Sequence, residues 1–118
     1  MTSRDMLKWG ALVLNNGKLD GEQFISAEYL ARATSGLTQT TAEWQPDTYR
    51  YGYLMYQTNL FVGDQIYDAA FSWGGGGQRI IVIEELDLTI VTTGHDVEDD
   101  DTTLLDRISE HVLPAFAQ

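Results

Sequence analysis

Residues 69–94 read AAFSWGGGGQRIIVIEELDLTIVTTG, and this stretch decides the fold class. The run from Arg79 to Ile83 is rich in β-branched residues, which favour strands. An apolar segment ending at Trp73 precedes it, and an acidic turn at residues 84–87 separates it from a further β-branched run at residues 88–93. Short apolar runs divided by turn residues are typical of antiparallel strands. The sequence therefore predicts an antiparallel meander.

The first part of the chain has helical patterns. Apolar residues recur at helical spacing over residues 3–15, after Thr2 and Asp5 in the arrangement of a capping box. The following residues 15–17, Asn-Asn-Gly, favour the end of a helix. Ser26 is expected to cap a second, shorter helix, with Tyr29, Leu30 and Ala33 on one face.

The middle and the end of the chain complete the pattern. Residues 34–48 are polar, contain Pro46 and predict a loop, and the aromatic run from Tyr51 to Tyr56 predicts a strand. Thr103 is expected to cap a last helix, which Pro114 ends or kinks. The apolar face of this helix comprises Leu104, Leu105, Ile108, Val112 and Phe116. The order predicts one α+β domain over residues 1–118, with a meander packed with N-terminal helices and a C-terminal helix.

Composition limits the classes of partner. Seven basic and eighteen acidic residues give a net charge of −11, which repels nucleic acid and anionic membrane surfaces. No apolar run approaches the roughly 20 residues of a membrane span. The absence of cysteine removes disulfides and thiolate sites. The simplest explanation of the acidic excess is solubility.

Several motifs fail on inspection. A phosphate loop needs lysine and a hydroxyl residue after its last glycine, but Gln78 and Arg79 stand there, and Arg79 also breaks the dinucleotide fingerprint. The acidic run at residues 96–101 lacks the glycine and glutamate of a calcium loop. His95 and His111 have no neighbours that complete a metal set. The sequence predicts no cofactor and no metal.

The order of motifs resembles the serine β-lactamase-like hydrolases, a family that includes class C β-lactamases, D-alanyl-D-alanine carboxypeptidases, related esterases and 6-aminohexanoate-dimer hydrolases. The shared pattern is a helix of the form S-x-R-D-x-x-K-x-G-x-L-x-L-N-x-G, then Y-G-Y, then G-G-Q before an apolar strand. The matching residues are Arg4, Asp5, Lys8, Gly10, Leu12, Leu14, Asn15, Gly17, Tyr51, Gly52, Tyr53, Gly76, Gly77 and Gln78, and Ser3 stands one position after the serine of the pattern. The resemblance covers nearly the whole chain and implies a β-lactamase/transpeptidase-like fold.

The resemblance also implies an absence. The family's nucleophile lies in S-x-x-K and an assisting tyrosine lies in Y-x-N, and neither motif occurs in this sequence. In the family both motifs precede the segment seen here. The chain therefore resembles the C-terminal portion of such a hydrolase, with no catalytic residue of its own and inactive alone. Its implied partner is the missing N-terminal part, and the resemblance suggests an extracytoplasmic location.

The glycine run has a role in this family. The third motif, K-T-G, H-T-G or W-G-G, lies on a strand whose backbone binds substrate, and a following N–H helps form the oxyanion hole. Trp73, Gly74 and Gly75 match the W-G-G form, with Gly76 as the oxyanion donor. A register one residue earlier, Ser72-Trp73-Gly74 with Gly75 as donor, fits nearly as well. The lack of a cation here favours esterase or amidase chemistry over β-lactamase activity.

Two alternatives stay open at this point. The glycine run is also what a hairpin or bulge would use. The chain as a whole is also compatible with a free-standing, non-catalytic interaction domain that dimerises through its sheet. Either as a fragment or as a free domain, it is expected to self-associate through exposed apolar surface.

Overall fold

The structure is a computed structural model that describes residues 2–39, 48–53, 55–74, 78–94 and 102–117. The described residues form an α+β fold with an antiparallel meander, as the sequence predicted. The helices are α1 (Ser3–Leu14), α2 (Ala27–Ala33), α3 (Thr102–His111) and the 3-10 turns η1 (Glu84–Leu86) and η2 (Leu113–Ala115). The strands are β1 (Lys18–Leu19), β2 (Glu22–Gln23), β3 (Thr38–Gln39), β4 (Arg50–Tyr51), β5 (Tyr56–Val62), β6 (Gln65–Gly74), β7 (Gln78–Ile83) and β8 (Leu88–Thr92).

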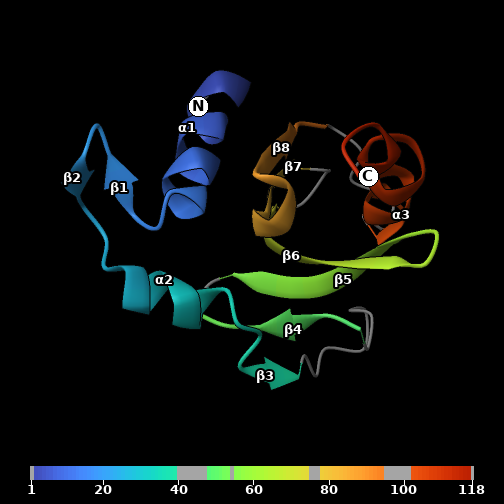
Figure 1. The fold of residues 1–118 in the computed structure, drawn as a ribbon, viewed down its shortest axis with the longest axis horizontal. Coiled ribbons are helices and arrows are strands. Elements are labelled where there is room, and N and C mark those ends of the chain that lie inside the picture. The colour runs from blue at the N-terminus through green and yellow to red at the C-terminus, as the bar shows by residue number, and fades with distance from the viewer. Residues whose placement is uncertain (1, 40–47, 54, 75–77, 95–101, 118) are drawn as a thin grey trace.

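Six strands form one antiparallel sheet in the sequential order β3-β4-β5-β6-β7-β8. Figure 1 shows the sheet nearly edge-on, with α1 on one side of β7 and β8 and α3 on the other. The register pairs Phe71 with Ile81 and Trp73 with Arg79. Since side chains alternate between the faces of a strand, these four residues share one face.

The main core lies on the face that α3 covers. It joins residues of the meander to α3 and η2: Tyr49, Leu60, Tyr67, Ala69, Phe71, Ile81, Ile83, Leu105, Ile108 and Leu113. Burial of each large side chain contributes about 1.5–3 kcal/mol, so this cluster dominates the stability of the sheet. The β-branched run that ends β7 forms its centre, because Ile81 and Ile83 are fully buried.

On the opposite face α1 packs directly on β7 and β8. Gly10 makes this contact possible, since a Cβ there would overlap the Thr89 methyl carbon and lie 3.0 Å from Cγ2 of Ile80. The helix begins with the predicted capping box, in which Thr2 and Asp5 exchange hydrogen bonds. It ends at Asn15, and Asn16 and Gly17 have the predicted left-handed conformation.

The predicted strand from Tyr51 to Tyr56 is wrong. β4 ends at Tyr51 and β5 begins at Tyr56, and a turn joins them in which the Gly52 N–H donates to the Met55 carbonyl at 2.7 Å. Gly52 packs so closely against the carbonyl of Ala33, in α2, that a Cβ would collide with it. The aromatic composition favoured a strand, but this contact with α2 fixes a turn.

Other strands were not predicted. β3 lies within the expected loop 34–48, of which residues 40–47 fall outside the described ranges. β1 and β2 form a small hairpin in which Asp20 and Gly21 both have positive φ, as a type I′ turn requires. β5 and β6 form a long hairpin around Gly63, whose φ is 58°.

The helical predictions after residue 17 are confirmed in part. The Ser26 hydroxyl accepts the Tyr29 N–H at 3.0 Å, as an N-cap should, although the Tyr29 side chain is exposed. Thr103 is not the N-cap of the last helix, because α3 already includes Thr102. Phe116 is not in the core: α3 ends at His111, before Pro114, and the tighter turn η2 directs Leu113 inward instead.

Candidate functional site

The predicted substrate strand is the end of β6. Trp73 and Gly74 are its last residues and pair with Arg79 and Gln78 of β7. On the other side β5 begins at Tyr56, opposite Phe71. β6 therefore extends three residues, 72–74, beyond the start of its neighbour. Gly75 and Gly76, the other predicted site residues, lie outside the described residues.

The register shows which way the backbone of this end points. The two-residue loop after β5 makes Val62 and Gln65 its hydrogen-bonded closing pair. Hydrogen-bonded pairs alternate along an antiparallel ladder, so Phe71 directs its backbone groups toward β5. Trp73, two residues on, directs its N–H and C=O to the same side, past the start of β5. This is the geometry that an added substrate strand would need.

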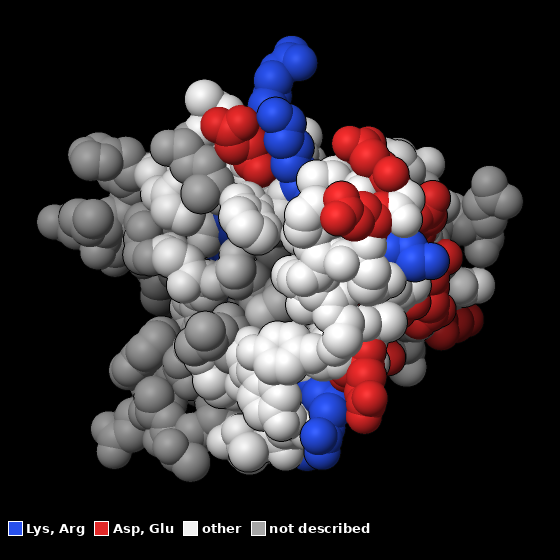
Figure 2. All heavy atoms as spheres, turned by 90° about the vertical axis from the view of Figure 1, so that its left-hand side faces the viewer, with Lys and Arg blue, Asp and Glu red and all other residues white. Residues whose placement is uncertain are grey.

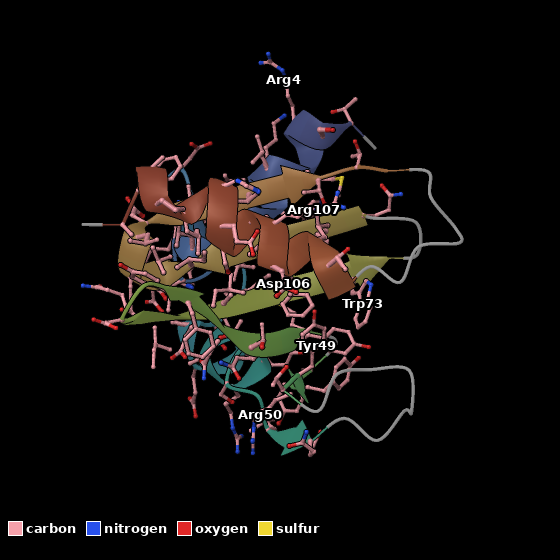
Figure 3. All side chains as sticks on the ribbon, turned by 90° about the vertical axis from the view of Figure 1, so that its right-hand side faces the viewer. Arg4, Tyr49, Arg50, Trp73, Asp106 and Arg107 are labelled. Atoms are coloured by element: carbon pink, nitrogen blue, oxygen red, sulfur yellow. The ribbon has the colours of Figure 1, made fainter. Side chains whose placement is uncertain are left out.

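The Trp73 side chain points into the sheet's core face instead. Its ring centroid lies 5.5 Å from that of Tyr49 and 5.3 Å from that of Tyr56. The guanidinium carbon of Arg79 lies 4.3 Å from the Trp73 centroid and 5.3 Å from that of Phe71. Figure 3 shows Trp73 and Tyr49 together at this end of the sheet, below α3.

Arg79 holds this cluster together electrostatically. It is fully buried, and a desolvated cation over an aromatic ring gains about 2 kcal/mol or more. Trp73 and Arg79 are also direct cross-strand neighbours, so the contact reinforces the β6–β7 ladder where it ends. The side chain of Trp73 thus fixes the strand end, while its backbone points to the β5 side of β6.

Gln78 fixes the start of β7, which pairs with the end of β6. Its side-chain amide donates to the Gly94 carbonyl, and its carbonyl oxygen accepts the Gly94 N–H at 3.2 Å. The two bonds add one rung to the sheet beyond β8, which ends at Thr92. The start of β7 is therefore held on both sides, by Gly74 and by Gly94.

Sequence reasoning missed the roles of Arg79 and Tyr49. Arg79 entered only as a residue that excludes a dinucleotide motif. Alternate residues of a strand share one face, so Arg79 lies on the same face of β7 as the buried Ile81 and Ile83. This alternation could have predicted that Arg79 is buried. Tyr49 stood next to a predicted loop, and nothing in its sequence neighbourhood marks it as a core residue.

The hydroxyl and imidazole groups that could form another site are dispersed. Ser72 is half-buried on the α1 face, where its Oγ accepts the Ile80 N–H at 3.2 Å. His111 is exposed and lies 3.7 Å from the Glu110 carboxylate. His95 and the acidic run 96–101 are outside the described ranges. Among the residues with a described position, no group of three or more metal-ligating side chains occurs.

Comparison with known proteins adds no assignment. No family model matches the sequence, and no curated protein matches it. None of the helices in the described ranges is long and apolar enough to cross a membrane.

Proposed function

We propose that this chain is the C-terminal portion of a serine β-lactamase-like hydrolase of the esterase or amidase type. It would supply one strand wall of the active site and the closing helix, and another part of the protein would supply S-x-x-K and Y-x-N. The observation that carries the proposal is the end of β6, where the W-G-G match begins. There the strand extends beyond the first residue of β5, and the Trp73 backbone points to the β5 side of β6.

In this role the described residues would act through positioning. The Trp73 backbone would hydrogen-bond substrate as an added strand would, with Gly74 leaving room beside it. Arg79 and Gln78 would hold the strand end rigid, because both are fixed to their neighbours within the sheet. A pre-organised N–H from Gly76, or from Gly75 in the alternative register, would stabilise the developing oxyanion.

Exposed apolar side chains are consistent with a missing partner segment. Trp9 and Leu7 on α1 are 53% and 41% exposed, and Phe24 after β2 is 60% exposed. Figure 2, which faces α1 and the β1–β2 hairpin, shows a broad white area between separate charged groups. Surface of this kind is commonly covered by other protein. We expect the isolated chain to self-associate, and a clean monomer in light scattering at high concentration would count against this.

The coding sequence upstream of Met1 is the first test. An open frame that encodes S-x-x-K and then Y-x-N supports the proposal, and an in-frame stop codon next to a ribosome-binding site overturns it. The longer protein should then hydrolyse a nitrophenyl ester, and the activity should disappear when the serine of S-x-x-K becomes alanine.

Proline substitutions in the longer protein would identify the oxyanion donor. Gly76→Pro removes the backbone N–H and should lower kcat by about 10²–10³-fold, whereas Gly76→Ala keeps the N–H and serves as the matched control. A larger loss for Gly75→Pro than for Gly76→Pro would support the earlier register. Equal, small losses for both proline variants would contradict a backbone oxyanion donor at this position.

The second candidate is a free-standing domain that dimerises through its sheet. It is favoured by β8, an edge strand whose five residues are all uncharged and half-buried. Natural edge strands usually carry charges or proline that prevent pairing. A stoichiometric dimer at micromolar concentration, together with an upstream stop codon, would favour this candidate over the hydrolase portion.

A further inference from the structure

A groove runs between α3 and the edge of β5, and Tyr49, which packs on Trp73 at the end of β6, is one of its lining residues. It has a volume of about 690 Å³. Its floor includes Leu60 and Leu105, which are both buried, and one wall is formed by Asp106, Ser109 and Glu110 of α3. In Figure 3 Asp106 lies between α3 and the strands below it, on the side of the molecule that faces the viewer.

The edge of β5 along this groove extends past its neighbour. β4 pairs with β5 only at Tyr56 and Gln57, although β5 continues to Val62. Hydrogen-bonded pairs alternate along β5 and β6, as described above for the Trp73 backbone. The residues of β5 that form such pairs with β6 are Tyr56, Thr58, Leu60 and Val62. Asn59 and Phe61 therefore direct their N–H and C=O groups outward, on the β4 side but beyond the end of β4. Both residues also line the groove.

The wall that faces this edge is acidic. Asp106 and Glu110 are four residues apart, hence on one side of α3, and both are exposed. Asp106 forms no ion pair with any described residue, and the Glu110 carboxylate lies 3.7 Å from Nε2 of the exposed His111. Arg50 lies on the opposite rim of the groove. Its Nε donates to the Gly36 carbonyl at 3.2 Å, and this hydrogen bond keeps the side chain from the acidic wall.

We propose that this groove binds an extended peptide segment with a basic side chain. The peptide backbone would pair with Asn59 and Phe61 of β5, and its lysine or arginine would lie against Asp106 and Glu110. Strand addition to a sheet edge supplies hydrogen bonds through the main chain, and the acidic wall supplies selectivity. The net charge of −11 also attracts cationic peptides over distance. The inference is independent of the hydrolase proposal, because it uses neither the glycine run nor any catalytic residue.

Three peptides would test charge and backbone separately. The probe is the blocked pentapeptide Thr-Val-Lys-Val-Thr, compared with its Glu-centred analogue and with a form N-methylated at alternate amides. Titration followed by amide chemical shifts should perturb residues 59–61 and 105–110. The Lys peptide should bind several-fold more tightly than the Glu peptide, and N-methylation should abolish binding. Equal binding of the Lys and Glu peptides, undiminished binding after N-methylation, or no binding at millimolar concentration would overturn the proposal.

Variants locate the interaction. Asp106→Asn with Glu110→Gln should weaken the Lys peptide up to about tenfold, since each exposed ion pair contributes little, and should leave the Glu peptide no weaker. The matched control, Glu84→Gln with Glu85→Gln on η1, should leave both affinities unchanged.

Hydrogen exchange in the free protein tests the other possible occupants. The amides of Asn59 and Phe61 should exchange rapidly and become protected when the Lys peptide is added. Slow exchange without peptide, at all protein concentrations, would mean that the chain itself already fills the edge, and would overturn the proposal. Protection that appears only as protein concentration rises would assign the groove to a second copy, and would also overturn it.

Discussion

Replacing Gly10 with alanine should weaken the contact between α1 and the sheet. The new Cβ would overlap the Thr89 methyl carbon and would lie 3.0 Å from Cγ2 of Ile80. Overpacking of a close contact costs about 1–3 kcal/mol, and alanine regains about 1 kcal/mol of helix propensity. Because Thr89 belongs to a paired strand and cannot move freely, we expect a net loss of about 1–2 kcal/mol in the free energy of unfolding.

The clash has one main partner, so it can be relieved. Thr89→Ser removes the methyl group and keeps the hydroxyl, and in that background Gly10→Ala should cost less than about 0.5 kcal/mol because only the Ile80 contact remains tight. Urea unfolding of the four proteins, followed by tryptophan fluorescence, gives the coupling energy directly. Gly21→Ala is unsuitable as a control because Gly21 has positive φ, but Ala11→Gly, at a half-buried position of α1, reports the helix-propensity difference together with the loss of one methyl group. A coupling energy near zero would refute the packing of α1 on β8 described above.

Three further predictions concern other contacts. Arg79→Lys should lower the free energy of unfolding by about 1–2 kcal/mol, because lysine lacks the planar group that stacks on Trp73; an unchanged urea midpoint would contradict the cation–π contact. Gln78→Ala should lower the free energy of unfolding by about 1–3 kcal/mol. Gln78→Glu keeps only the hydrogen-bond acceptor, so its midpoint of thermal unfolding should lie between those of Gln78→Ala and wild type. Hydrogen bonding to the side chain and then the backbone of Thr2 lowers the pKa of Asp5 below 3.8, so the stabilisation is present above pH 3.8 and is lost as pH falls through the lowered value. The difference in free energy of unfolding between wild type and Asp5→Asn should accordingly vanish in strong acid. A difference that grows on acidification would contradict a lowered pKa of Asp5 in the folded protein.

Local chemistry explains which elements were predictable. The capping box at Thr2 and Asp5 and the cap at Ser26 act within four residues, so the sequence alone locates both helix starts. The β-branched run of β7 likewise needs no distant partner to favour a strand. The Asp20-Gly21 hairpin was equally local, since Asp-Gly is a type I′ signal, and it was overlooked because its strands have only two residues each.

Distant contacts explain the rest. The turn after Tyr51 depends on Gly52 meeting the carbonyl of Ala33, nineteen residues earlier in the chain, and no local pattern shows that contact. At the site, the family resemblance pointed to Trp73 and Gly74, but the direction of the Trp73 backbone follows only from the register of β5 against β6. Buried Arg79 lies over the Phe71 and Trp73 rings of β6, and Tyr49 and Tyr56 pack in turn on Trp73.

The glycine run itself can be weighed against the hairpin alternative. Gly74 pairs with Gln78, so three residues connect β6 to β7. A three-residue hairpin loop characteristically needs glycine at one left-handed position, not at every position and not in the strand before it. Gly74 is in the strand, has no positive φ, and weakens the strand by about 0.5–1 kcal/mol relative to alanine. A Cβ on Gly74 would lie 3.2 Å from Cβ of Gln78, which is tight but does not collide with backbone. A hairpin loop would thus require one glycine of the four, and the proposed approach of a substrate backbone along the end of β6 would explain the others.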